Sequence, residues 1–200
     1  EIILIDDCSF DNSQKKIISS KYYSEIRYFR NSINKGPAYS RNQVIKKSKG
    51  DFICFMDDDD ISDKSRVYHQ IKSIYEEGYP NNNKIISICG VIRKYPSGYE
   101  KKMRPLGVKG KTPKGELLID YILFNQRYKK IDYGFGTPTC SMLLTRNCFE
   151  EAGLFDETLR RVEDLDIAVR FAKLNFIFKG LDQFLVTQNS TLGSDKTPLV

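Results

Sequence analysis

Residues 50–60 read GDFICFMDDDD, an apolar run that is followed at once by four aspartates, Asp57 to Asp60. The run has the length of a short buried strand, so the carboxylates would stand together at its carboxyl end. Neighbouring carboxylates raise one another's pKa unless a cation neutralises them, and oxygen ligands favour hard ions such as Mg²⁺ or Mn²⁺. The stretch therefore predicts a buried strand that ends in a divalent-metal site. The alternative is a solvated acidic turn that caps a helix starting near Asp63.

The chain around this run alternates between strand and helix patterns. Strands are predicted at residues 1–5, 25–29 and 51–56, and helices at 12–23, 36–47 and 64–77. Strands joined by helical crossovers predict an α/β fold with a mostly parallel, twisted, doubly wound sheet flanked by helices. Ligands of such sheets bind beyond the carboxyl ends of the strands. Because Asp6 and Asp7 end the first strand, we expect both acidic clusters to face one crevice.

The second half of the chain is less regular. Strands are predicted at 84–91 and 139–145, and helices at 115–124 and 162–174. Between them, residues 93–114 form a basic loop rich in glycine and proline, and a loop of this length in a compact domain is usually functional or mobile. Glu163 and Asp164 fall in the first turn of the last helix. The helix dipole favours carboxylates there, which is the structural alternative to a catalytic role.

Composition limits the class of protein. A chain of 200 residues with 40% hydrophobic residues can bury one core. The five cysteines form no C-x-x-C pair, which favours reduced thiols in a cytoplasmic protein. The basic patches behind the net charge of +6 suit phosphates or a lipid surface, and no nucleic-acid-binding motif accompanies them. No apolar stretch approaches the ~20 residues of a membrane span, so we expect at most peripheral contact with a membrane, at its inner face.

Four segments resemble motifs of the inverting family 2 glycosyltransferases with the GT-A fold, in the same order and at similar separations. Residues 6–13 (DDCSFDNS) resemble V-D-D-G-S-x-D-x-[ST], with Cys8 in place of the usual glycine. Residues 34–42 (NKGPAYSRN) are similar to N-x-G-x-[AS]-x-A-R-N, and residues 50–60 to the segment that contains the D-x-D motif. Residues 153–166 resemble G-x-F-D-E…E-D-x-D. Together the segments span most of the chain, which makes the signal specific.

The resemblance implies roles for the residues that bind the donor. Asp6 and Asp7 would meet the nucleotide base, and the planar guanidinium of Arg41 would help to neutralise the diphosphate. Asp57 and Asp58 would contact the nucleotide-sugar, with one carboxylate of the D-x-D pair reaching the ribose. The expected ligands of the metal, Mn²⁺ or Mg²⁺, are Asp59 and Asp60. The alternatives are strand-end charges and a surface arginine.

The resemblance also implies a catalytic base. Asp164, with Glu163 beside it, would deprotonate the acceptor hydroxyl as that hydroxyl attacks the anomeric carbon from the face opposite the leaving group, and a single displacement inverts the configuration. Shielding from water and nearby acids would raise the pKa of Asp164 toward a useful range.

The chain departs from the family pattern in two further places. The family begins with a further strand and helix that contact the nucleotide, and this sequence has no counterpart before Glu1. Many relatives carry a carboxyl-terminal Arg-x-His segment, whereas residues 187–191 read TQNST. The single histidine, His69, falls inside a predicted helix, where we expect it to be partly exposed. Metal binding would therefore rest on carboxylates, phosphates and water.

These observations lead to one GT-A domain over residues 1–200, with a nucleotide-sugar half at 1–92 and an acceptor half at 93–200. The first hypothesis is a metal-dependent inverting glycosyltransferase of bacterial cell-envelope polysaccharide biosynthesis. It would move sugar from a UDP-sugar to a hydroxyl of a glycan or lipid-linked acceptor, with no nucleic-acid partner. The alternatives are a non-catalytic nucleotide-sugar-binding module of a larger synthase and a metal-binding interaction domain.

Overall fold

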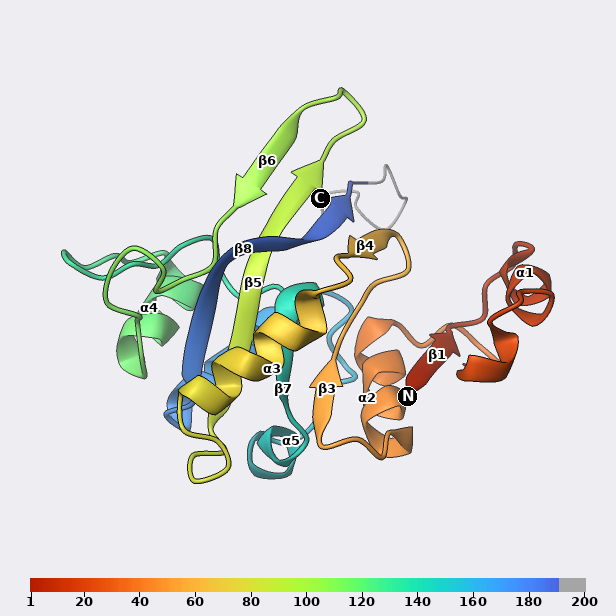
Figure 1. Ribbon diagram of the computed structural model, residues 1–200, viewed down its shortest axis with the longest axis horizontal. Coiled ribbons are helices and arrows are strands. Elements are labelled where there is room, and N and C mark those ends of the chain that lie inside the picture. The colour runs from red at the N-terminus through yellow and green to blue at the C-terminus, as the bar shows by residue number, and fades with distance from the viewer. Residues whose placement is uncertain (191–200) are drawn as a thin grey trace.

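The computed structural model describes residues 1–190 as an α/β fold with a curled sheet flanked by helices (Figure 1). The strands are β1 (Ile2–Asp6), β2 (Ile26–Arg30), β3 (Phe52–Cys54), β4 (Asp60–Ser62), β5 (Ile85–Lys94), β6 (Glu100–Met103), β7 (Met142–Thr145) and β8 (Ile177–Asn189). The helices are α1 (Ser13–Ile18), α2 (Pro37–Lys47), α3 (Arg66–Glu76), α4 (Glu116–Phe124), α5 (Asn147–Ala152) and α6 (Glu163–Lys173), with short 3₁₀ turns at Tyr23–Glu25 and Thr139–Ser141. The predicted α/β class with flanking helices is confirmed.

The main sheet has the strand order β3-β7-β5-β8-β4, and β6 pairs with the outer part of β5. Within residues 1–190, the parallel pairs are β5 with β8 and β1 with β2, and the other four pairs are antiparallel. The prediction of mostly parallel pairing is therefore wrong. Periodicity identifies extended segments, but the direction of a strand in the sheet depends on the path of the segment that connects it to its neighbours. The long excursion after β5 returns the chain in the reverse direction, so β7 runs antiparallel to both β3 and β5.

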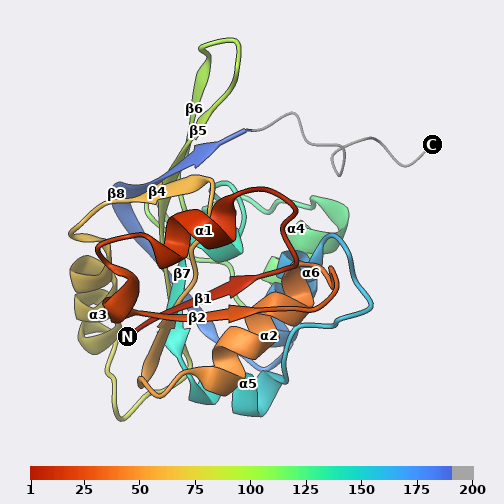
Figure 2. The same ribbon diagram turned by 90° about the vertical axis from the view of Figure 1, so that its right-hand side faces the viewer.

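The main sheet is apolar on both faces, which explains why helices pack on each of them. Figure 2 shows α3 on one side and α4, α5 and α6 on the other. The largest core cluster fills the second layer, where side chains of α6 such as Ile167 and Phe171 are fully buried against Ile86 of β5. On the other face, Ile74 of α3 packs with Ile85. Burial on both faces explains why β5 reads as a continuous apolar run.

The strand β8 connects this core to the acidic run. Its register against β5 shifts near Gly90, where a Cβ atom would come within 2.7 Å of the Phe184 ring. A glycine is therefore needed for this close approach. Beyond the irregularity, β8 pairs with β4 so that Gln188 lies opposite Asp60. The end of β8 thus positions the last aspartate of the run.

A second, two-stranded sheet carries the first acidic pair. β1 and β2 pair in parallel, and α2 packs against β1. The small sheet stands at the edge of the molecule in Figure 1, next to α2. The helix predicted at 12–23 is shorter than expected, since α1 ends at Ile18. Within the described residues, no helix has the length and apolar character that crossing a membrane would require.

Candidate functional site

Arg41 of α2 joins two segments that are far apart in the sequence. Its Nη2 donates to Asp57 Oδ1 at 3.0 Å, and its Nη1 donates to Glu163 Oε1 at 2.5 Å. Glu163 is only 8% exposed, so this guanidinium pairs with a carboxylate that is largely shielded from water. Burial lowers the pKa of Arg41, but the charges of Asp57 and Glu163 outweigh burial and raise it overall. The acidic end of β3 and the start of α6 therefore meet at one cation.

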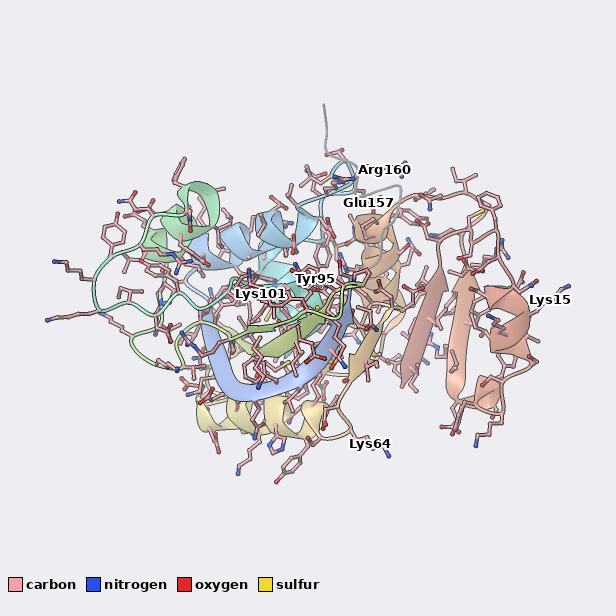
Figure 3. The ribbon with its side chains drawn as sticks, turned by 90° about the horizontal axis from the view of Figure 1, so that it is seen from above. Lys15, Lys64, Tyr95, Lys101, Glu157 and Arg160 are labelled. Carbon is pink, nitrogen blue, oxygen red and sulfur yellow. The ribbon has the colours of Figure 1, made fainter. Side chains whose placement is uncertain are left out.

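The segment before α6 is fastened to α2 by a buried asparagine. Asn42 is 1% exposed, and its amide both donates to the Phe155 carbonyl and accepts from the Phe155 N–H, each at 2.9 Å. Its Nδ2 also donates to Glu157 Oε1 at 2.9 Å. Arg160 donates to Asn34 at 3.1 Å, and Figure 3 shows Glu157 and Arg160 together beside α2. These hydrogen bonds thus hold the segment 153–166 against the segment 34–42. Sequence reasoning missed Asn42, although it closes the quoted motif.

The acidic run divides into two exposed and two enclosed carboxylates. Asp58 and Asp59 are exposed, whereas Asp57 is partly buried and Asp60 is 5% exposed. Neither carboxylate oxygen of Asp60 has a hydrogen-bond partner within residues 1–190. Burial, followed by the charges of Asp57 and Asp59, raises the pKa of Asp60 to about 6, although the neighbouring Cys140 thiol and the Asn189 backbone lower it. The helix-capping alternative does not explain this carboxylate, since Asp63 accepts the Ser65 N–H ahead of α3.

The residues present fit a divalent cation. A carboxylate oxygen of Asp57, one of Asp60 and the sulfur of Cys140 lie within 4.8 Å of one another. Ligand atoms around an ion with bonds of about 2.1–2.5 Å stand about 3–5 Å apart, so this spacing is suitable. A cation would also compensate the unpartnered carboxylate of Asp60. The structure thus brings together Asp57 and Asp60, and the metal role expected for Asp59 stays a prediction.

The first acidic pair makes internal contacts. Asp6 is buried and accepts hydrogen bonds from the Ser9 N–H and the Tyr28 hydroxyl, both at 2.8 Å. Burial raises the pKa of Asp6, but these hydrogen bonds outweigh it and lower the pKa overall. Asp7 accepts from the backbone N–H groups of Lys35 and Gly36, at 2.9 and 2.6 Å, just before α2 begins. Asp7 therefore fixes the start of α2, Asp6 fixes the turn after β1 against Tyr28 of β2, and the contact of the pair with a nucleotide base stays a prediction.

Asp164 lies half-buried in the first turn of α6, next to Glu163. Burial, and then the charge of Glu163, raises the pKa of Asp164. Its Oδ1 accepts the N–H of Leu165 at 2.9 Å. Val162, the residue just before the helix, has a left-handed backbone with φ of +61°, a strained conformation for a β-branched residue. Asp166, two residues on, instead pairs with Arg170 at 2.7 Å.

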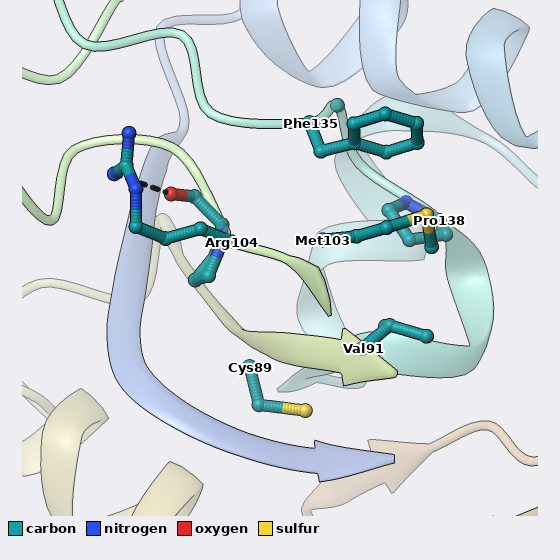
Figure 4. Close-up of a pocket in the computed structure, with 8 residues that line it drawn as sticks. Cys89, Val91, Met103, Arg104, Phe135 and Pro138 are labelled. Atoms are coloured by element: carbon teal, nitrogen blue, oxygen red, sulfur yellow. Dashed lines mark hydrogen bonds between the residues drawn. The ribbon is translucent and has the colours of Figure 1, made fainter. Parts of the chain in front are cut away.

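Two small cavities lie away from these groups. One of about 10 Å³ is enclosed by residues that include Cys89, Met103 and Phe135 (Figure 4), which is room for about one water molecule. The other, of about 180 Å³, is lined by polar residues such as Asp51 and Arg146 at the opposite end of β3. The arrangement of carboxylates around Arg41 is therefore the better candidate for a site.

Cys140 was missed by sequence reasoning, because no motif marks it.

Comparison with known proteins places this arrangement in a family. Residues 1–149 match the model of glycosyl transferase family 2. A curated relative is the amylovoran biosynthesis glycosyltransferase AmsB of Erwinia amylovora, which is 30% identical over 182 residues, covering 89% of this chain and 56% of AmsB. The chain spans about half, or less, of the length of the curated relatives first matched.

Solved structures agree on the fold. Staphylococcus aureus TarS 1-349 in complex with UDP-GlcNAc superposes with a TM-score of 0.72 at 18% identity, over 100% of this chain and 52% of that one. GalNAc-T7 with UDP, GalNAc and Mn²⁺ gives a TM-score of 0.62 at 17% identity, over 96% of this chain and 38% of that one. The chain therefore belongs to glycosyl transferase family 2 and has the GT-A fold.

Proposed function

We propose that the protein is a metal-dependent inverting glycosyltransferase that moves a sugar from a UDP-sugar to a hydroxyl of a glycan or lipid-linked acceptor. The observation that carries the proposal is the Arg41 bridge between Asp57 and Glu163. It joins the cation-binding carboxylates to the turn that holds Asp164. Donor and acceptor groups can therefore react at one place.

On the donor side, Asp57 and Asp60 would hold the cation, and the exposed Asp58 and Asp59 would be available to the nucleotide-sugar. When bound, the cation supplies positive charge that stabilises the departing nucleoside diphosphate. Arg41 holds Asp57 in place and contributes a second positive charge near the phosphates. Asp7 fixes the loop before α2, and Asp6 fixes the turn after β1, near where the base would lie.

On the acceptor side, Asp164 takes the proton of the attacking hydroxyl. Its raised pKa suits a general base, because proton transfer is most effective when the pKa of the base lies near the working pH. Glu163 is tied to Arg41 and acts by positioning the turn and by adding negative charge next to Asp164. Attack from the face opposite the leaving group inverts the anomeric carbon.

The relatives support this proposal at the level of substrate class. TarS was solved in complex with UDP-GlcNAc, and GalNAc-T7 with UDP and Mn²⁺. The name of AmsB refers to the biosynthesis of amylovoran, which supports a glycan acceptor and a role in polysaccharide biosynthesis. The five cysteines are free thiols, which fits a reducing compartment such as the cytoplasm, where the inner face of the membrane would present a lipid-linked acceptor.

The test is a pair of variants in the first turn of α6. We expect Asp164→Asn to lower turnover by at least about a hundredfold, because it removes the proton acceptor, while UDP affinity in Mn²⁺ stays within about twofold. Asp166→Asn is the matched control, since that side chain pairs with Arg170, and it should keep turnover. Turnover of UDP-sugars would be measured beside calorimetric UDP binding. Full activity of Asp164→Asn would remove Asp164 from this role.

The same measurement separates the enzyme from a non-catalytic module. Mn²⁺-dependent UDP binding without turnover of any UDP-sugar would favour a nucleotide-sugar-binding part of a larger synthase. An absence of UDP binding with and without Mn²⁺ would contradict both.

A further inference from the structure

The thiol of Cys140 faces carboxylates. Cys140 lies in the 3₁₀ turn Thr139–Ser141 that leads into β7, and it is 2% exposed. Its sulfur lies in the cluster with Asp57 and Asp60, and it accepts a long hydrogen bond from Nε2 of Gln188 at 4.0 Å.

The other two buried thiols of the fold point toward backbone carbonyl groups. Cys89 donates to the Ser141 carbonyl at 3.7 Å, and Cys148 to the Asn83 carbonyl at 3.8 Å. A protonated thiol there can donate to only one carboxylate oxygen at a time, whereas a cation would be shared by both carboxylates and the sulfur. The position of Cys140 thus differs from that of an ordinary core cysteine.

The unpartnered carboxylate of Asp60 is an independent sign of a ligand at the same place. Asp60 is 95% buried, and neither of its oxygens has a hydrogen-bond partner within the described residues. Buried polar groups are nearly always satisfied, so an ionised carboxyl group of this kind calls for a bound partner, and a cation would compensate its charge as well. Because the two carboxylates and the sulfur lie within 4.8 Å, an ion that satisfies Asp60 would also be within reach of Cys140.

We propose that Cys140 Sγ is a third protein ligand of the cation held by Asp57 and Asp60, so that the site favours thiophilic divalent ions over Mg²⁺. The inference rests on the cation site of the proposed function. Carboxylate oxygens accept Mg²⁺ and Mn²⁺ alike, whereas sulfur is a soft ligand that Mg²⁺ avoids. Zn²⁺ and Co²⁺ should therefore bind most tightly, and Mn²⁺ more tightly than Mg²⁺. Binding releases the thiol proton to solvent.

Cobalt provides a direct test that needs neither nucleotide nor turnover. The purified protein is stripped with a chelator and titrated with Co²⁺, and the near-ultraviolet charge-transfer absorption of a cobalt–thiolate bond is recorded. We expect the band in the wild type and in Cys89→Ser, whose sulfur lies in the same core cluster but outside the acidic one. Cys140→Ser should lack it. A wild type without the band, or a Cys140→Ser variant that keeps it, would overturn the proposal.

Affinity gives the second readout. Competition between Zn²⁺ and Mg²⁺ should show that Cys140→Ser lowers the Zn²⁺ affinity by about tenfold or more and leaves the Mg²⁺ affinity within about threefold. If circular dichroism shows that Cys140→Ser does not fold, Cys140→Ala replaces it. Equal losses for both ions would mean that the thiol only packs the site. The two proposals can fail independently. A wild type that binds no UDP would contradict the proposed function, and the cobalt result would still stand.

Discussion

Two acidic segments end two strands of this protein, and their environments are opposite. At the end of β1, Asp6 and Asp7 receive hydrogen bonds from a hydroxyl group, a side-chain amide and backbone N–H groups. At the end of β3, Arg41 donates to Asp57, whereas neither oxygen of Asp60 has a hydrogen-bond partner among residues 1–190. The pKa of Asp6 is lowered, whereas the pKa of Asp60 is raised to about 6.

The difference separates a structural carboxylate from a functional one. A satisfied carboxylate stabilises the fold, and here Asp6 joins Ser9 to Tyr28 while Asp7 secures the loop that starts α2. An unsatisfied buried carboxylate destabilises the fold, and such groups gather at functional sites, where a ligand compensates them. The proposed cation site is therefore assigned to the second acidic segment, although both segments look alike in the sequence. Stability measurements on single carboxylates can test this distinction.

The largest stability effect is expected for Asp60→Asn. Since the pKa of Asp60 rises from 3.8 to about 6, keeping this carboxyl ionised in the fold costs about 3 kcal/mol. Without added divalent ions, Asp60→Asn should therefore raise the free energy of unfolding by about 2–3 kcal/mol at pH 7. The gain should disappear below about pH 4, where the carboxyl is protonated in both the folded and the unfolded wild type. Urea denaturation at several pH values measures it.

Asp59→Asn is the matched control, because its side chain is exposed beside Asp60. It should change stability by less than about 0.5 kcal/mol. Saturating Mn²⁺ should stabilise the wild type and reverse its order relative to Asp60→Asn. If Asp60→Asn is less stable than the wild type at pH 7 without metal, the comparison between the two acidic segments is wrong.

Asp6→Asn should have a smaller effect of opposite sign. It replaces one acceptor oxygen by a donor facing the Ser9 N–H or the Tyr28 hydroxyl, which costs about 2 kcal/mol at pH 7. Because the folded pKa of Asp6 is lowered, its contribution is complete above the unfolded value of about 4 and is lost as the pH falls through the folded value. Thermal unfolding at pH 7 and at low pH measures both.

A double-mutant cycle with Tyr28→Phe isolates the hydroxyl contact. If the Asp6–Tyr28 hydrogen bond carries the effect, the two substitutions together should cost clearly less than the sum of each alone. An additive pair would assign the loss to the Ser9 contact instead.

The sequence predicted those elements whose side chains follow one regular period. The apolar run of β5 and the helices α4 and α6 lie where the pattern placed them. It did not predict β8, because the register irregularity near Gly90 breaks the two-residue alternation, and the strand carries polar residues such as Gln183 inside it. Strand direction was lost for a related reason, since pairing partners are chosen by tertiary packing rather than by local pattern. Residue 191, which ends the segment 187–191 discussed for the missing histidine, lies outside the described residues.

The candidate site was predicted as a set of acids and one arginine, but not as an arrangement. Motif order indicated Arg41, Asp57 and Asp164, and the fold brings the first two together through an ion pair. Which aspartates of the run are enclosed depends on β8 pairing with β4, so Asp60 could not be distinguished from Asp59 by sequence. Cys140 lies in a turn that is far from the acidic run in the sequence. Its position beside Asp57 and Asp60 depends on tertiary contacts alone.

The smallest predicted effect concerns Cys8, which follows the satisfied acidic pair. Cys8 has a left-handed backbone with φ of +66°, which disfavours a residue with a Cβ by about 1–2 kcal/mol and suits glycine. Glycine loses more chain entropy on folding, so Cys8→Gly should stabilise the protein by about 0.5–1 kcal/mol net. The thiol contact to the Ser32 carbonyl, at 3.5 Å, is exposed and weak. Thermal unfolding under reducing conditions measures the change.

Cys8→Ala is the control that separates backbone from thiol. It removes the same sulfur but keeps the left-handed penalty, so it should leave stability unchanged or slightly lower. A gain for glycine and none for alanine would show that the turn after Asp7 is held in a strained conformation by the hydrogen bonds that Asp7 makes to Lys35 and Gly36. Equal losses in both variants would mean that the thiol contact fixes the turn, and the first acidic segment would then depend on more than its carboxylates.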